Sequence, residues 1–437
     1  MAESYLCLAA KSRYINAISW TYALFPISLL HTLAYDCSSP IQNMSLQSLF
    51  NEGVPAIRGL PTPASIPKEP VSLATIKYLG YTDDAAADIW RRWAARFPTG
   101  QPQELEFSLG KPFIDAIVEF SSCRYEIDTD DNDDFKWLEC MDQCGINRST
   151  QAAIMDPVYK RLRLTRSCLN WLRDTMELRY RALKEVLEAR GRDHNKARGA
   201  AMAPGVSRHS AMSQAARRAV PGVVNLYKCL DAASISQLFD KNGNIDCIAA
   251  LATNTPTDFC GRGLSWSFTV ERDVAVLDSH WAKARSSLSS MVIVHATIPI
   301  STMQGLSEQQ ELQRVHWPSE EWKRLVFVSR KGLKFPPELR RFEEAPLIIG
   351  TAASKSDKAY GLMDSHDEVT EDMVLKTEDG RPVVQCVFLG DDGEDLLSDN
   401  ADIQVYAVTS EEHERWRDRV AEDAWNDMAA LLSGSLV

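Results

Sequence analysis

The clearest hydrophobic pattern of the chain lies between Asp258 and Ile298. Leu264 to Thr269 alternates large apolar with small polar residues, which is typical of a strand with one buried face. From Asp273 to Arg285, apolar residues recur at three- and four-residue spacing, which predicts an amphipathic helix. Met291 to Ile298 is a β-branched run that predicts a fully buried strand, ended by Pro299. Together they form one folding unit, with small polar side chains at its entrance.

The rest of residues 221–437 carries shorter patterns of the same two kinds. Period-two and apolar runs predict strands at Val223 to Tyr227, Leu347 to Gly350, Val383 to Leu389 and Ile403 to Val408. Helical spacing predicts helices at Ser234 to Phe239, Ser319 to Arg330, Asp391 to Leu397 and Glu411 to Leu432. Strands and helices without a regular β-α-β alternation indicate an α+β domain over 221–437.

Residues 71–191 show only helical spacing. Thr82 or Asp83 can cap a helix that ends at Pro98, and a second helix is expected from Pro112 to Ser122. Trp90 and Trp93 share one side of the first helix, a spacing typical of a core or of a groove for a protein partner. This part of the chain is therefore predicted to be all-α.

A long helix is predicted over 157–190. Asp156 followed by Pro157 is a typical helix start, and apolar residues then recur at alternating four- and three-residue steps up to Gly191. The result is a seam like that of a coiled coil. It packs either inside the protein or against a second copy.

Composition divides the chain further. Residues 1–70 hold an apolar leader and a Pro/Ser-rich linker, and residues 192–220 are basic and low in large apolar side chains, which predicts a flexible linker. The net charge is -12. Because phosphate affinity needs clustered Lys and Arg, this charge argues against nucleic acid as a partner.

Two features bear on localisation. Ten cysteines are scattered without a Cys-x-x-Cys pair, which favours a reduced, cytoplasmic protein. Residues 14–35 contain no Asp, Glu, Lys or Arg, so a secretory signal or a membrane anchor is the alternative. Pro26 and several polar residues within this run weaken that alternative.

Common catalytic signatures are missing. The chain has no Gly-x-Gly-x-x-Gly, no Walker loop, no Gly-x-Ser-x-Gly elbow and no His-Glu-x-x-His, and its eight histidines are dispersed. The sequence therefore predicts no metal site and disfavours an ordinary dehydrogenase, NTPase, lipase or metalloprotease.

Residues from about 223 to 409 nevertheless resemble a family. The likeness rests on five stretches in order: LYKCLDAAS, DFCGRGLSWSFTVERDVA with HWAKAR, HWPSEEWKRLVFVSRKG, APLIIGTAASKSDKAY and VVQCVFLGDDGEDLL. They are similar to an uncharacterised domain family of the ADP-ribosyltransferase superfamily, which has bacterial and divergent fungal members. The resemblance implies a split β-sheet whose cleft binds NAD, with nicotinamide in its middle.

It also implies roles for residues on two strands. The first strand of the superfamily places an aromatic and then a cationic residue against the NAD phosphates or ribose, and the match is Tyr227 with Lys228. The second motif, with a stacking ring and hydroxyls, matches Gly263, Trp266, Ser267 and Thr269. The residues alone fit equally well a core Trp266 with solvent-facing serines, so both interpretations stay open.

The third strand places Gln385 at the catalytic position, together with Ser267. Breaking the nicotinamide bond builds positive charge on the ribose, which a carboxylate stabilises and a neutral amide does not. Glu320 or Glu321 would then have to supply that carboxylate.

Three functions are consistent with these residues. The first is an NAD-dependent ADP-ribosyltransferase or NAD glycohydrolase. The second is an inactive pseudoenzyme that binds NAD or another ligand, which Lys228 and Gln385 favour over the first. The third is an interaction protein whose helical region recruits a protein partner.

Overall fold

The computed structural model describes residues 66–96, 112–193, 206–207, 221–240, 242–254, 256–420 and 422. All of them belong to the unit Pro63–Val437. The predicted leader, the loop that follows it up to residue 65, and nearly all of the predicted linker 192–220 lie outside the described residues. No described helix combines the length and the apolar composition that a membrane span requires.

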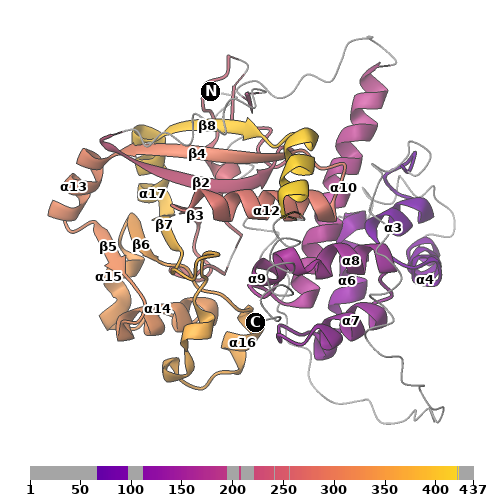
Figure 1. Cartoon of the computed structure of the whole chain (residues 1–437), viewed down its shortest axis with the longest axis horizontal. Helices are drawn as coiled ribbons and strands as arrows, with labels where there is room; N and C mark the ends of the chain where they lie inside the picture. Colours follow the sequence, from indigo (N-terminus) through magenta and orange to yellow (C-terminus); the bar gives the residue numbers. More distant parts are fainter. Residues whose placement is uncertain are drawn as a thin grey trace, which may run out of the picture. The chain divides into compact units, whose positions relative to one another are not determined.

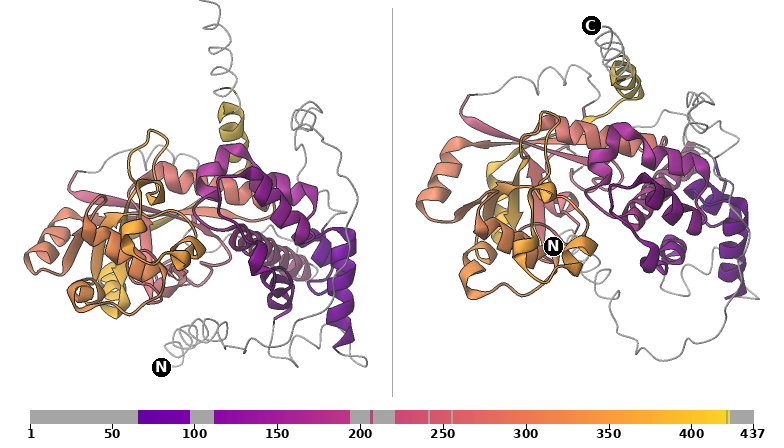
Figure 2. Two further views of the ribbon diagram at one scale, coloured as in Figure 1. Left: turned by 90° about the horizontal axis from the view of Figure 1, so that it is seen from below. Right: turned by 60° about the horizontal axis from the view of Figure 1, so that its bottom comes forward.

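Every described element between residues 66 and 193 is a helix. In order these are α3 (Leu73–Leu79), α4 (Asp83–Ala95), α6 (Phe113–Ser122), η2 (Tyr125–Ile127), α7 (Asp134–Gln143), α8 (Arg148–Met155), η3 (Pro157–Tyr159), α9 (Lys160–Arg163) and α10 (Cys168–Asp193). The predicted start of α4 is confirmed, since the Thr82 hydroxyl accepts a hydrogen bond from the Ala85 N–H. Figure 2 shows these helices, coloured indigo to magenta, gathered together.

The prediction of one helix over 157–190 is wrong at its N-terminal end. The chain makes η3 and α9 first, then breaks, and α10 begins only at Cys168. At the break the Thr165 hydroxyl donates to the Leu162 carbonyl and the Ser167 hydroxyl accepts from the Asn170 N–H. The apolar periodicity runs across the break because both segments bury apolar side chains. α10 itself packs against α3, α6 and α7.

The described strands form one eight-stranded sheet in the order β1-β8-β4-β2-β3-β7-β6-β5. They are β1 (Val206–Ser207), β2 (Val223–Asp231), β3 (Ser265–Thr269), β4 (Met291–Pro299), β5 (Leu312–Val315), β6 (Leu347–Thr351), β7 (Val384–Leu389) and β8 (Asp402–Ala407). The pairs β1–β8 and β5–β6 are parallel and the others antiparallel. The chain is therefore α+β. The predicted strands are confirmed, most with ends shifted by one residue, while β2 runs four residues beyond the predicted end at Tyr227. β5 and β1, which lies within the predicted linker 192–220, were not predicted. Figure 1 shows β8, β4 and β2 side by side.

Helices connect these strands. They are η4 (Ile248–Leu251), α12 (Arg272–Arg285), α13 (Ile300–Glu308), α14 (Glu320–Arg330), η5 (Pro337–Leu339), α15 (Arg340–Glu343), α16 (Asp357–Leu362), η6 (His366–Glu368), η7 (Glu371–Met373), α17 (Gly390–Asn400) and a terminal helix over 410–420. The remainder of the predicted 411–432 helix, apart from residue 422, lies outside the described residues.

The helix predicted at 234–239 is wrong. That segment forms successive turns, in which the Ser234 hydroxyl donates to the Asp231 carbonyl and the Leu238 N–H to the Ile235 carbonyl. Six residues are too few for helical spacing to outweigh such local hydrogen bonds.

The two faces of the sheet bury different cores. On one face, Trp266 and Phe388 pack in a core that includes α13 and α17. On the other face, Tyr227 lies in a small cluster with Ala275 of α12, and Val387 lies in a separate cluster with residues of α14. β3 lies between these two clusters, and its Ser267 and Thr269 are half-buried on this second face.

The helical region and α12 share one core. Trp281 of α12 belongs to the same buried cluster as Trp171 of α10, with ring centroids 4.3 Å apart. The Arg285 guanidinium lies against both rings and donates to the Asp174 carboxylate. These contacts hold the sheet-bearing residues and the helices together within the unit.

Candidate functional site

The sheet splits between β2 and β3. These two strands pair only at Tyr227 and Thr269, whereas β2 pairs along its whole length with β4, and β3 pairs along its whole length with β7. On one side of that contact, Thr253 bridges the two strands. Its hydroxyl accepts from the Ser267 N–H at 2.8 Å and from Lys228 Nζ at 2.7 Å. β2 and β3 are thus neighbours in one sheet with a single paired position, and Thr253 of the preceding loop lies between them beside that position.

The residues assigned to the site from the sequence do not all share one face. Residues that pair across antiparallel strands point to the same side, so Tyr227, Thr269 and Gln385 lie on the face that α12 and α14 cover. Ser267 follows Thr269 at a two-residue step and points the same way. Lys228 alternates with Tyr227 and lies on the opposite face, where its Nζ is 5.6 Å from the Phe268 ring centroid.

Trp266 is part of the core. Its side chain is 0% exposed, and its indole N–H donates to the Ile248 carbonyl at 2.9 Å. This placement agrees with the core interpretation of Trp266, not with a ring that stacks on a ligand. Gly263 closes the turn before β3, where its N–H donates to the Cys260 carbonyl at 3.0 Å.

Lys228 is half-buried on its own face. Its Nζ donates to the Leu251 carbonyl and to the Thr253 hydroxyl, each at 2.7 Å. Burial lowers the pKa of Lys228 to about 7. This side chain therefore holds the η4 loop against β2 and does not face the residues around Gln385.

The pKa of Lys228 leads to a stability prediction. Between pH 7 and the ordinary lysine pKa the unfolded chain binds one proton more than the folded chain, so stability rises with pH in this window. We expect the wild-type advantage over Lys228→Met to grow by about 1 to 2 kcal/mol from pH 7 to pH 9. Urea unfolding at both pH values measures it. Lys77→Met, at an exposed position of α3, is the control. If the free energy of unfolding changed equally with pH in both variants, the lowered pKa of Lys228 would be contradicted.

Gln385 lies in a buried polar network around Asp258. The Gln385 amide nitrogen donates to Asp258 Oδ2 at 2.5 Å, and the Ala353 N–H donates to the same oxygen at 2.7 Å. Arg330 Nε donates to Asp258 Oδ1 at 2.6 Å. Asp258 is only 7% exposed, so its charge is compensated inside the protein. The Gln385 amide oxygen takes no hydrogen bond from the described residues.

The loop before β3 places Asp258 beside Gln385. A pair of residues, Thr257 and Gly261, closes this loop, and Gly261 has a φ of 57°, a conformation that favours glycine. Phe259 then packs on β6 at Gly350, where an added Cβ would come within 2.6 Å of the ring. A side chain at position 350 would displace Phe259, so this glycine allows the approach of Asp258.

Arg330, at the end of α14, connects the network to α16. Its Nη1 donates to Asp357 Oδ1 at 3.0 Å, and its guanidinium lies 5.8 Å from the Tyr360 ring centroid. Burial alone would lower the pKa of Arg330, but the Asp258 and Asp357 carboxylates raise it above its ordinary value. Arg330 therefore stays charged and fixes the Asp258 carboxylate.

A second carboxylate lies next to Thr269. Glu271 Oε2 accepts from the Thr269 hydroxyl at 2.9 Å and from the Val384 N–H at 3.1 Å. Glu271 thus lies where β3 and β7 meet, beside Val384, the residue that precedes Gln385 in β7. Sequence reasoning missed both Asp258 and Glu271, although Asp258 begins the hydrophobic unit and Glu271 follows its first strand.

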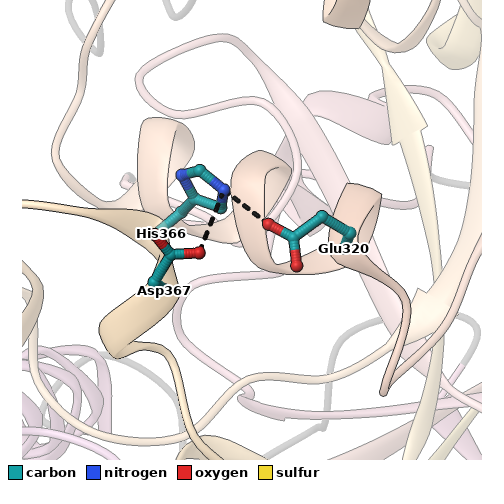
Figure 3. Close-up of side chains that lie close together, drawn as sticks. All are labelled: Glu320, His366 and Asp367. Carbon is teal, nitrogen blue, oxygen red and sulfur yellow. Dashed lines mark ion pairs between the residues drawn. The ribbon is translucent and has the colours of Figure 1, made fainter.

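Glu320 and Glu321 do not reach this network. Glu321 pairs with Arg341, and Glu320 Oε1 lies 2.5 Å from His366 Nε2 (Figure 3). Together with Asp367, whose Oδ1 is 3.6 Å from the same nitrogen, Glu320 and His366 are the group of described residues that could hold a metal ion. Arg324 Nε lies 3.1 Å from His366 Nε2, so a cation already occupies this position.

No protein-family model, no curated protein and no solved structure matches this chain. Hydroxyls and an amide oxygen line one face beside the split, and both neighbouring carboxylates are engaged by donors. Such a set can bind a hydroxyl-rich ligand. Arg330 neutralises Asp258, whereas Glu271 accepts from a hydroxyl and a backbone N–H, both uncharged.

Proposed function

We propose that residues 221–420 form an ADP-ribosyltransferase-like module that binds NAD beside the β2–β3 split and does not transfer ADP-ribose. The split itself carries the proposal, because Tyr227, Ser267, Thr269 and Gln385 lie on one face next to it. The amide oxygen of Gln385 can accept a hydrogen bond from a ribose hydroxyl, and the hydroxyl oxygens of Ser267 and Thr269 can also accept hydrogen bonds from the ligand.

The inactive form is favoured over a transferase by two observations. The Gln385 amide nitrogen already serves Asp258, and Arg330 neutralises Asp258. Lys228, the only cation that the resemblance assigns to the NAD phosphates, lies on the other face of the sheet. An NAD molecule beside Gln385 would therefore lie on the face opposite Lys228 and would meet an Asp258 that is already neutralised. The Glu271 carboxylate nearby is engaged by the Thr269 hydroxyl and the Val384 N–H.

Titration calorimetry of NAD into the full chain tests the binding half of this proposal. We expect saturable binding, weakened about tenfold by Ser267→Val, since one lost hydrogen bond and an added methyl group near a ligand are worth about 1.4 kcal/mol. Thr297→Val on β4, away from the split, is the control and should bind as the wild type. Absence of binding at millimolar NAD would contradict the proposal.

The same preparation tests the inactive half. Incubation with NAD labelled in the nicotinamide ring should release no label above a protein-free blank. Release at a rate that depends on protein concentration would mean that the module is an enzyme.

A further inference from the structure

A cavity lies between α4 and α6, in the helical region that precedes the strands in the sequence. Its volume is about 390 Å³, and both helices contribute to its wall. Ile89 and Trp93 come from α4, and Phe113, Ile117 and Phe120 come from α6. Trp93 and Phe113 meet edge to face with ring centroids 5.1 Å apart. The wall is thus mainly apolar and aromatic, as in sites for small organic ligands, and its volume falls within their usual range.

Three arginines complete the wall of this cavity. They are Arg92 and Arg96 of α4 and Arg124, which follows α6. Glu119 is the one acidic residue in the wall, and Asp88 beside the wall pairs with Arg92 at 2.8 Å. The three arginines still outnumber these two carboxylates, although the whole chain has a net charge of -12. A local excess of positive charge in an acidic protein attracts anions to that place in particular.

Each guanidinium is held by an aromatic ring of the wall. Arg92 and Arg124 lie 5.3 Å and 5.7 Å from the Phe120 ring centroid, and Arg96 lies 5.8 Å from that of Trp93. The Arg92 side chain is 67% exposed, and at such positions a cation–π contact contributes about 0.5 to 1 kcal/mol, enough to favour these placements. Two like charges therefore lie against the same ring, and an added anion would offset their repulsion beyond what Asp88 does for Arg92.

We propose that this cavity binds a small amphipathic organic anion, with a carboxylate or sulfonate head on the arginines and an apolar or aromatic body against the half-buried Ala116 and Phe120. The charge of the wall selects the head, and the aromatic wall selects the body. The volume suits one molecule of this size and is too small for a docked helix. This site is separate from the split in the sheet, and the proposal does not depend on NAD binding.

Fluorescence titration with 8-anilinonaphthalene-1-sulfonate, an aromatic sulfonate, tests the proposal on the full chain. We expect one saturable site. The uncharged analogue N-phenyl-1-naphthylamine has the same body without the head and should bind at least tenfold more weakly. This comparison uses only the wild-type protein, so it does not depend on the folding of any variant.

A second test of the proposal replaces individual arginines of α4 by glutamine. Arg92→Gln and Arg96→Gln should each weaken binding of the sulfonate about tenfold. Arg91→Gln is the matched control, since Arg91 and Arg92 both pair with Asp88, at 2.9 Å and 2.8 Å, but only Arg92 lies in the cavity wall. Equal affinity for the charged and uncharged probes, or equal weakening by Arg91→Gln and Arg92→Gln, would overturn the proposal.

Discussion

Replacement of Asp258 by asparagine is expected to lower the free energy of unfolding by about 3 to 5 kcal/mol, the range found when one partner of a buried ion pair is removed. Asp258 is 7% exposed and accepts hydrogen bonds from Arg330, Ala353 and Gln385. Without the charge of Asp258, Asp357 is the carboxylate that remains beside Arg330. The amide nitrogen of the new asparagine would also point at groups that are themselves hydrogen-bond donors.

Urea unfolding followed by tryptophan fluorescence measures this change. Asp379→Asn is the matched control, because Asp379 also pairs with an arginine, Arg381, at 2.7 Å, but both side chains are largely exposed. We expect this control to change stability by less than about 1 kcal/mol. Similar losses for the two variants would show that the Asp258 network is not the buried centre described above.

Local patterns predicted most elements of the fold. The alternation before Thr269, the run at Met291 and the cap at Thr82 each depend on residues close together in the chain, and each is confirmed. The exceptions are also local, since the breaks at 164–167 and 234–239 depend on side-chain hydrogen bonds that apolar spacing does not register.

The site could be predicted only in part. The strands that carry Tyr227, Ser267 and Gln385 were located from the sequence, but the face on which each side chain lies depends on strand pairing between distant segments. A shift of one residue separates Tyr227 from Lys228 and places them on opposite faces. Asp258 belongs to a loop, and its approach to Gln385 depends on Gly350, which is 92 positions further on in the sequence numbering.

The position of Gln385 gives a second large effect. Gln385→Glu would put a carboxylate at the proposed ribose site, and it would raise NAD hydrolysis only if that carboxylate stayed ionised. In the structure the Gln385 amide nitrogen donates to Asp258, so a carboxylate at this position would meet another carboxylate at hydrogen-bond distance. Two carboxyl groups so close cannot both ionise at low cost, and the pKa of the introduced group would rise by about two to three units.

This change makes stability depend on pH in a defined direction. An unfolded glutamate ionises near pH 4.3, so between about pH 4 and pH 7 the folded variant binds more protons than the unfolded chain, and its stability falls as pH rises. We expect Gln385→Glu to match the wild type near pH 4, where the protonated carboxyl can donate to Asp258 as the amide does. At pH 8 it should be less stable by about 2 to 4 kcal/mol.

Gln404→Glu is the matched control for this prediction. Gln404 also donates its amide to an aspartate, Asp402, at 2.9 Å, but both residues are exposed on β8, so water screens the introduced charge. Its stability should stay within about 0.5 kcal/mol of the wild type at both pH values. A Gln385→Glu variant that matches the wild type in stability at both pH 4 and pH 8 would contradict the contact with Asp258. Release of nicotinamide by that variant would show that an ionised carboxylate at this position makes the module an enzyme.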